Sequence, residues 1–462
     1  MKADQIFDIA IIGGGVVGAA IARKLSHFQK TVALIEAGSD IGVGTSKANT
    51  AILHTGFDAT PGSLESQLLT KSYFLLKDYA AEVGIPLEFT GAIMVAWSQE
   101  ELDQLPAIQA KAEKNGVTAV QVLSAAEVYT REPHLGPGAM GGLLVIDESI
   151  ICPFTPPLAF GYEAVANGVE LFLNSRVTSV SRRDGHHVIK TLKADYHCQW
   201  LINAAGLYSD EIDRLLGHRR FTVTPRRGEL IVFDKLARSL IKHIILPIPT
   251  KTTKGVLVSP TVFGNILLGP TAENLSNKEN SATTPQGLSS LLEKGRKILP
   301  QLLEEEVTST YAGLRAATEH SDYQIFSEKE QSYICVGGIR STGLSASLGI
   351  AHYVFELLEQ AGLSFQPKAI IEKIKMPFIG TNRVRPGESD EMIKSNPDYG
   401  RIICHCEQVS RGEIRDAQKA VIPAVDLDGL RRRTRCLQGR CQGFYCSATI
   451  THLLEEPSER SS

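Results

Sequence analysis

Residues 8–36 read DIAIIGGGVVGAAIARKLSHFQKTVALIE. A short apolar run at 8–12 ends in three glycines, a helix-like pattern covers 16–25, and a second apolar run at 31–35 ends in Glu36. This order predicts a strand, a glycine turn, a helix and a second strand. A strand–helix–strand unit is how a parallel sheet begins, so the stretch indicates an α/β fold.

The glycine turn predicts a nucleotide site. Gly13, Gly15 and Gly18 fit the pattern G-x-G-x-x-G, which allows a tight turn, close approach of a pyrophosphate, and packing of the helix on the strand. The helix N-terminus then directs unpaired N–H groups at the phosphates. Glu36, 18 residues after Gly18, is placed to accept hydrogen bonds from a ribose. The motif alone does not choose between NAD and FAD, and a turn that serves packing only stays open.

Two further segments favour a flavin. Residues 45–56 read TSKANTAILHTG, a polar stretch in which Thr45, Ser46 and Asn49 are candidates to run beside an isoalloxazine. Residues 201–209 form a strand that ends in small residues, among them Ala205 and Gly206. Small side chains let the backbone approach a cofactor closely.

Composition narrows the class of protein. The chain has 462 residues, which predicts more than one hydrophobic core, and its formal net charge of −3 does not predict nucleic-acid binding. We find no apolar run of the ~20 residues that cross a bilayer, and no secretory signal at the start. The expected location is cytoplasmic.

The later segments alternate between the two element types. Strand-like runs at 170–172, 200–202, 229–233, 255–259 and 265–268, with helical patterns at 64–83, 100–115 and 349–361, predict α/β structure with an inserted antiparallel sheet. Residues 376–399 are rich in Pro, Gly, Asn and charge, as in a linker. A compact module then follows.

The module concentrates the cysteines. Of eight in the chain, five lie between Cys404 and Cys446. Clustered cysteines in a cytosolic chain favour metal binding over disulfides. Four thiolates in two close pairs suit a [2Fe–2S] cluster or a Cys₄ zinc site, and the C-x-C spacing of Cys404 and Cys406 is less usual for zinc.

Taken together, the chain resembles the D-amino-acid-oxidase-like flavoproteins, in the branch of glycerol-3-phosphate dehydrogenase and L-2-hydroxyglutarate dehydrogenase. The resemblance rests on the glycine motif and on segments 49–62, 203–206, 227–229, 254–261, 269–270 and 337–346. It implies a Rossmann-like FAD-binding domain interleaved with a mixed or antiparallel substrate domain. It also places the backbone of Gly343 and Leu344 near the flavin, at the start of a helix whose dipole stabilises reduced flavin.

The implied domain organisation has four parts. Residues 1–375 form the flavoprotein, with the FAD part at about 1–80, 150–215 and 325–370 and the substrate part at about 81–149 and 216–324. Residues 376–399 are the linker, 400–455 the small helical [2Fe–2S] domain, and 456–462 the tail.

The resemblance also assigns the substrate site. His54 is the candidate base, since an imidazole suits proton abstraction at neutral pH, although it could instead orient or covalently hold the flavin. Lys254 and Arg315 are candidate anchors for an anionic substrate. Arg340 stands where the branch often has an acid, and is either a third anchor or the partner of a carboxylate. We interpret Arg226 and Arg227 as a structural ion pair.

The cysteine module resembles the bacterioferritin-associated-ferredoxin-like [2Fe–2S] domain. That resemblance implies Cys404, Cys406, Cys441 and Cys446 as ligands and leaves Cys436 as a spare. Pairing of Cys436 with Cys441 is the alternative. The arginines at 431–435 are expected on a helix with partners on the domain surface.

The implied activity is FAD-dependent oxidation of the secondary alcohol of a small anionic substrate, with sn-glycerol 3-phosphate favoured. The alternatives are a 2-hydroxy acid dehydrogenase, an amine or imino-acid dehydrogenase, and an electron-transfer subunit without catalysis. The resemblance implies a partner that accepts electrons from the [2Fe–2S] cluster, either a flavoprotein subunit or a quinone-linked protein. A peripheral position at the inner face of the membrane is the alternative to a free cytoplasmic chain.

Overall fold

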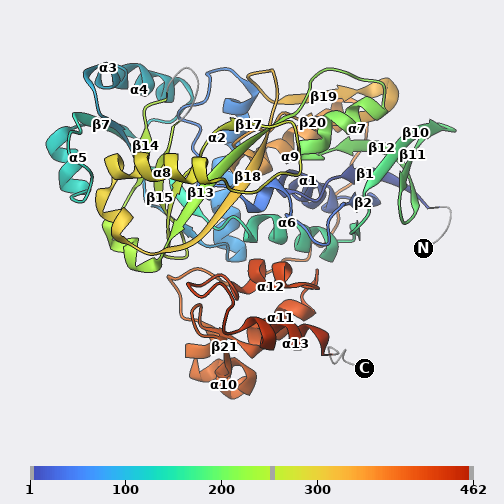
Figure 1. Cartoon of the computed structure of the whole chain (residues 1–462). Helices are drawn as coiled ribbons and strands as arrows, with labels where there is room; N and C mark the ends of the chain where they lie inside the picture. The colour runs from blue at the N-terminus through green and yellow to red at the C-terminus, as the bar shows by residue number, and fades with distance from the viewer. Residues whose placement is uncertain (1–4, 250–254, 457–462) are drawn as a thin grey trace.

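The computed structural model describes residues 5–249 and 255–456. The chain forms a large body that contains two large sheets and one small sheet, and a smaller body built by its C-terminal elements (Figure 1). In the described part, no helix is both long and apolar enough to cross a membrane.

The first sheet carries the nucleotide turn. Its main path runs β10-β11-β12-β1-β2-β9, with β20 beside β12 and β19 beside β20. The strands are β1 (Ile6–Ile12), β2 (Val32–Ile35), β9 (Glu170–Phe172), β10 (Val177–Arg183), β11 (His186–Thr191), β12 (Asp195–Asn203), β19 (Gln324–Glu328) and β20 (Tyr333–Gly337). Strand β1 is parallel to both β2 and β12, as the strand–helix–strand pattern predicts.

Helices bury one another beside this sheet. Helix α1 (Val16–Ser26) packs against α6 (Thr155–Ala166) and α9 (Gly343–Gln360), and α9 packs in turn against α2 (Leu64–Val83). Their apolar residues join those of β1 and β2 in one core, which brings α9 from late in the chain beside the first turn.

The second sheet is here called the roof sheet. Its path is β17-β13-β16-β15-β14-β5-β7-β6, with β18 paired to β13. The strands are β5 (Ala92–Ala96), β6 (Val120–Ser124), β7 (Gly141–Val145), β13 (Thr224–Phe233), β14 (Ile244–Pro247), β15 (Leu257–Pro260), β16 (Ile266–Gly269), β17 (Glu273–Asn274) and β18 (Val307–Ala317). All neighbours are antiparallel except β5 and β14. The interleaved α/β fold predicted from the sequence is therefore confirmed.

Several smaller elements complete the large body. A short three-stranded sheet joins β3 (Ile52–Leu53), β8 (Ser149–Ile151) and β4 (Leu87–Glu88). The remaining helices are α3 (Gln99–Leu102), α4 (Leu105–Lys114), α5 (Ala125–Arg131), α7 (Ser209–Leu215) and α8 (Pro285–Ile298). The helix expected at 100–115 is thus two helices, because the chain turns at Asp103 before α4 begins.

The segment between the bodies is more ordered than its composition suggests. Within 376–399, helix α10 (Asp390–Ser395) forms, and the Ser389 hydroxyl accepts the N–H of Met392 at its start. Six residues are less than two helical turns, too short to show a period in the sequence.

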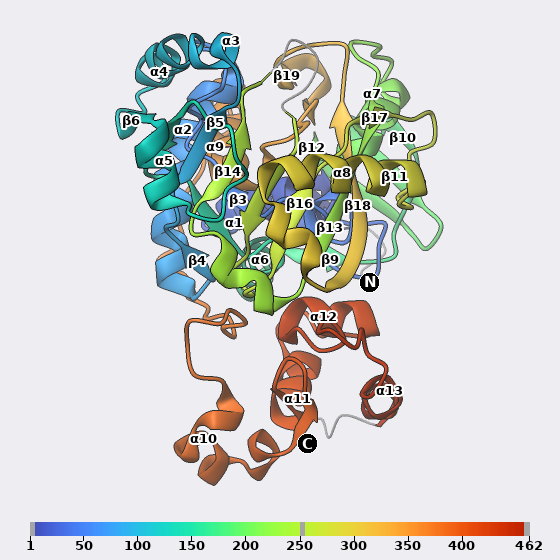
Figure 2. The same cartoon turned by 60° about the vertical axis from the view of Figure 1, so that its left-hand side comes forward.

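The small body has its own core. It contains β21 (Ile402–Cys404), β22 (Val409–Ser410), α11 (Arg411–Lys419), α12 (Leu427–Thr434) and α13 (Ser447–Glu455). Val409, Ile414, Leu430 and Ile450 are buried together at its centre. Helix α12 lies nearest the large body in both views (Figures 1 and 2).

Candidate functional site

Backbone atoms in and around the glycine turn lie too close together for a side chain at Gly13 or Gly18. Gly13 has φ +109°, and a Cβ there would lie 2.4 Å from the carbonyl oxygen of Ala204. A Cβ on Gly18 would lie 1.8 Å from the carbonyl oxygen of Gly13. Real Cβ contacts are never this short, so both positions require glycine, for the turn and for helix packing as predicted.

Glu36 directly follows β2 and lies beside this turn. Its carboxylate accepts the N–H groups of Gly14 and Gly38, each at 2.6 Å. Burial raises the pKa of Glu36, and these N–H groups act in the opposite direction. The carboxylate is therefore held by backbone donors at the start of α1, where the ribose of a dinucleotide lies in this fold.

A cavity of about 700 Å³ extends from the turn to the roof sheet. The residues predicted from the sequence that line it are Gly15, Thr45, Ser46, Asn49, His54, Gly206, Arg315, Arg340, Gly343 and Leu344. Gly13, Gly18 and Glu36 are not among the residues that line it, and Ala204 lines it where Ala205 was expected. The cavity thus joins the glycine turn to the N-terminus of α9, the two ends between which a flavin was predicted.

His54 faces a carboxylate that the sequence analysis missed. Strands β3 and β8 pair Leu53 with Ser149, so His54 and Glu148 are the next residues in register. The Nδ1 atom of His54 lies 3.0 Å from Oε2 of Glu148, although off the line of an ideal hydrogen bond. Glu148 is fully buried, and its Oε1 accepts both the N–H and the hydroxyl of Thr55.

This arrangement fits a histidine base with an orienting acid. A carboxylate beside Nδ1 favours the proton on that nitrogen and makes Nε2 the basic one. The only sequence signal for Glu148 is a charge between the apolar runs 143–145 and 150–151.

Two arginines oppose each other in the roof sheet. Arg226 on β13 and Arg315 on β18 are direct cross-strand partners, and both line the cavity. The Arg315 guanidinium donates to the carbonyl oxygens of Thr271, at 2.6 Å, and of Arg227. Burial first, and then the charge of Arg226, lower the pKa of Arg315 to about 10. Like charges placed opposite each other are destabilising, so the pair has the electrostatics of a site that an anion would stabilise.

The assignment of both Arg226 and Arg227 to a structural ion pair was half wrong. Arg227 is buried and its guanidinium contacts Glu273 at 2.5 Å and Glu229 at 3.7 Å, as predicted. Arg226 points to the other face of β13, toward the cavity, where its Nε donates to Asn274 at 2.8 Å. Side chains alternate along a strand, so adjacent arginines serve opposite faces.

The other candidate cations differ from Arg315. The Arg340 guanidinium donates to the carbonyl of Ser321 and lies 4.0 Å from Glu65, so its charge is already paired while it lines the cavity. Lys254 lies outside the described residues. Pro249 and Gly255 on either side of that segment both line the cavity.

The module's thiols form two pairs. Cys406 interacts with Cys441, and Cys404 with Cys446. The backbone N–H of Tyr445, followed by those of Gly443 and Phe444, lowers the pKa of Cys441. Backbone donors aimed at a sulfur suit a thiolate ligand.

The pairing of the thiols suits a [2Fe–2S] cluster. A [2Fe–2S] cluster takes two thiolates on each iron, whereas zinc requires four converging ligands. Cys436 is fully buried, and burial raises the pKa of its thiol to about 12, as for a structural thiol.

The arginine run docks the module. Arg432, Arg433 and Arg435 are buried, and the first two bind Asp40 of the flavin body. The run was expected on a helix with partners on the domain surface, and the partner of Arg432 and Arg433 is Asp40 of the flavin body. The Arg435 guanidinium stacks 3.9 Å from the ring centre of Phe263.

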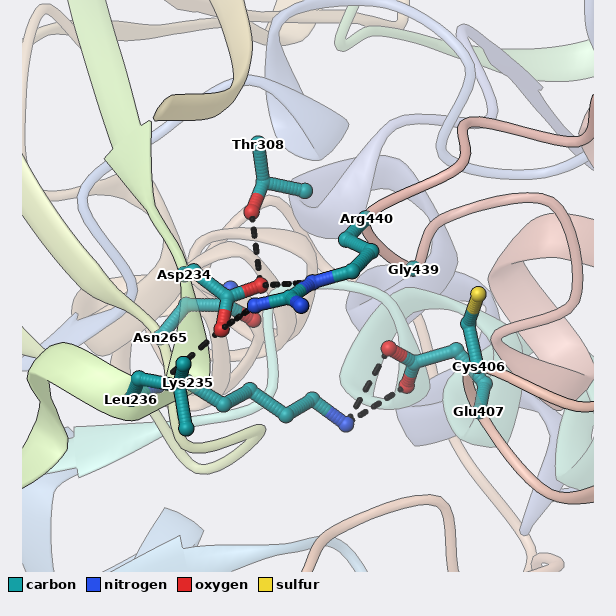
Figure 3. Close-up of a pocket in the computed structure, with 9 residues that line it drawn as sticks. All are labelled: Asp234, Lys235, Leu236, Asn265, Thr308, Cys406, Glu407, Gly439 and Arg440. Atoms are coloured by element: carbon teal, nitrogen blue, oxygen red, sulfur yellow. Dashed lines mark hydrogen bonds and ion pairs between the residues drawn. The ribbon is translucent and has the colours of Figure 1, made fainter. Parts of the chain in front are cut away.

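A cleft of about 240 Å³ lies at the edge of this interface (Figure 3). Arg440 of the module contacts Asp234 at 3.0 Å, and Lys235 contacts Glu407 at 3.1 Å. Cys406 lies on the same cleft and is exposed, so one proposed cluster ligand is near the surface.

Comparisons with known proteins agree with this geometry. Residues 8–357 match the FAD dependent oxidoreductase family, and residues 402–456 match the BFD-like [2Fe-2S] binding domain. The chain belongs to the FAD-dependent oxidoreductases, with an iron–sulfur domain at its C-terminal end. The predicted family, FAD and [2Fe–2S] cluster are confirmed.

Within this family, the chain is similar to the following individual proteins. Glycerol 3-phosphate dehydrogenase of Caloramator mitchellensis is 35% identical over 450 residues, covering 97% of this chain and 94% of that protein. The dithionite-reduced, FAD-bound L-α-glycerophosphate oxidase of Mycoplasma pneumoniae has a TM-score of 0.77 and 28% identity, covering 81% of this chain and all of that one. Human L-2-hydroxyglutarate dehydrogenase is 30% identical over 290 residues, 58% of this chain and 61% of that protein.

Proposed function

We propose that this enzyme oxidises sn-glycerol 3-phosphate to dihydroxyacetone phosphate. The observation that carries the proposal is the facing pair Arg226 and Arg315, with His54, which is backed by Glu148, lining the same cavity. A phosphate monoester carries nearly two negative charges at pH 7, whereas a carboxylate carries one. Two guanidinium groups therefore suit a phosphate ligand better than a ligand with a single carboxylate. The similarity to glycerol 3-phosphate dehydrogenase and oxidase supports the same substrate.

Each residue has a distinct part in this reaction. Arg226 and Arg315 bind the phosphate and fix the distance of the carbinol from the roof sheet. His54 takes the hydroxyl proton at Nε2, and Glu148 holds the ring and stabilises the imidazolium. FAD, when bound between the glycine turn and Gly343, supplies the two-electron acceptor for the carbinol C–H.

The cofactor positions follow from the same cavity. Gly15, Thr45 and Ser46 are proposed to lie along the pyrophosphate, and Glu36 to bind the ribose. Asn49 and Gly206 line the same cavity, and so do Gly343 and Leu344, the first two residues of α9. Free N–H groups at a helix start stabilise negative charge.

The test is anaerobic bleaching of the bound flavin by glycerol 3-phosphate, L-2-hydroxyglutarate, lactate and proline. Glycerol 3-phosphate is expected to bleach it at the lowest concentration. Arg226→Met and Arg315→Met should each raise KM about 10- to 150-fold, the worth of a charged hydrogen bond of about 1.5–3 kcal/mol. Arg340→Met should change KM less, because Glu65 already pairs with that charge. Bleaching by 2-hydroxyglutarate with glycerol 3-phosphate inert would refute the proposal.

We further propose that electrons leave through a [2Fe–2S] cluster held by Cys404, Cys406, Cys441 and Cys446 to a separate flavoprotein or quinone-linked acceptor, at the inner face of the membrane. The support is the thiol pairing and the docking of the module on the flavin body. Substrate should produce a reduced-cluster EPR signal in the wild type. A cluster that stays oxidised while the flavin bleaches would refute this route.

A further inference from the structure

The chain segment 38–47, here called loop 38–47, lies between the glycine turn and the module. On its inner side, the N–H of Gly42 donates to the carbonyl of Gly14 at 2.9 Å, and the N–H of Val16 donates to the Ser46 hydroxyl at 2.9 Å. Thr45 and Ser46 line the large cavity. The inner side therefore shapes the wall against which the start of α1 presents its N–H groups.

The outer side of loop 38–47 contacts α12 and its N-cap. Asp40 receives Arg432 and Arg433, each at 2.5 Å, and the carbonyl of Ile41 accepts Arg432 Nη1 at 2.6 Å. At the two ends of the loop, Ser39 donates to Asp426 at 2.8 Å and Lys47 pairs with Asp428 at 2.8 Å.

The central contact is buried. Asp40 is 2% exposed and Arg432 and Arg433 are each 3% exposed, so water cannot replace a missing partner without opening the interface. A buried charge that loses its partner is strongly destabilising, whereas exposed ion pairs contribute little. The position of loop 38–47 consequently depends on α12.

We propose that the iron–sulfur module is a structural part of the FAD site, because α12 clamps loop 38–47 in its nucleotide-binding position. FAD binding and docking of the module are then coupled, and coupling between two binding equilibria is reciprocal. A docked module tightens FAD, and bound FAD tightens the docking of the module.

The test uses full-length protein whose flavin has been removed and whose cluster is intact. FAD affinity is measured by quenching of flavin fluorescence, with cluster content followed by iron analysis and EPR. Arg432→Met is expected to raise the Kd for FAD at least tenfold with an unchanged cluster. Lys235→Met is the matched control, since it breaks the Glu407 bridge at the same interface without touching loop 38–47, and its Kd should stay within twofold of the wild type.

A second variant and a second measurement guard against misfolding. Asp428→Asn removes the partly exposed bridge to Lys47 at 2.8 Å and the longer one to Arg432 at 3.5 Å but keeps the contacts of Arg432 with Asp40, and should raise the Kd two- to fivefold. Hydrogen exchange of α12 should slow when FAD is added, while that of α11 stays the same. An unchanged Kd in both loop-contact variants, or an equal loss in Lys235→Met, would overturn the clamp. A rate of hydrogen exchange in α12 that does not change when FAD is added would overturn the coupling.

Discussion

The pair His54 and Glu148 makes the sharpest prediction about catalysis. Glu148→Gln keeps the size and shape of the side chain and removes its charge. The Gln carbonyl can still accept the N–H and hydroxyl of Thr55, as Oε1 of Glu148 does. Its NH₂ group is then the atom facing Nδ1 of His54, which moves the imidazole proton to Nε2 and removes the basic lone pair from that nitrogen.

The magnitude follows from the 3.0 Å separation between Nδ1 and Oε2. Coulomb's law at an effective dielectric constant of 20 gives about 5 kcal/mol as a ceiling. A charge-assisted hydrogen bond is worth about 1.5–3 kcal/mol after desolvation. Loss of the charge therefore predicts a kcat about 10- to 150-fold lower, with the tautomer change placing it at the upper end.

Anaerobic stopped-flow bleaching over a range of pH is the assay. Because the imidazolium loses the neighbouring negative charge, the acidic limb of the profile should move to lower pH. KM should change little, since Glu148 does not line the cavity. Glu132→Gln is the matched control, because Glu132 is also buried and contacts a histidine, His243, at 2.6 Å. An unmoved profile in Glu148→Gln, or an equal loss in Glu132→Gln, would refute the role of Glu148.

Three further predictions concern the anion site and the cluster. Burial and Arg226 lower the pKa of Arg315, so the folded state disfavours this cation at every pH below about 10. Arg315→Met should therefore raise the melting temperature of the ligand-free protein by about 1–3 °C. A lower melting temperature by calorimetry would contradict this reasoning. Inorganic phosphate should raise the melting temperature of the wild type but not of Arg226→Met, whereas equal shifts would show binding elsewhere. Cys441→Ser should lose the cluster's visible absorption while substrate still bleaches the flavin, and Cys436→Ser should keep full iron and sulfide; the reverse result would exchange the ligand assignments.

Local sequence was enough where the chemistry is local. The turn at Gly13, Gly15 and Gly18 and the acid at Glu36 lie within one strand–helix–strand unit. Glycine is required at Gly13 and Gly18 because a Cβ at either position would lie less than 2.5 Å from a backbone oxygen. The assignment of Arg226 was wrong because local sequence does not show which face of a strand is buried. A pair of adjacent arginines on a strand shows no sign of which face is buried, and here one serves the core and the other the cavity.

The sequence by itself determined the flavin-binding turn, the interleaved α/β class and the clustering of thiols in a separate module, because each depends on spacing within a few dozen residues. Only the tertiary structure placed Glu148 beside His54, Arg226 opposite Arg315, and Arg432 against Asp40. Thr55 and Glu148 are 93 residues apart, Arg226 and Arg315 are 89 apart, and Asp40 and Arg432 are 392 apart. Such pairs are set by strand register and by the docking of two bodies, and a periodic pattern in one segment carries no information about the partner segment.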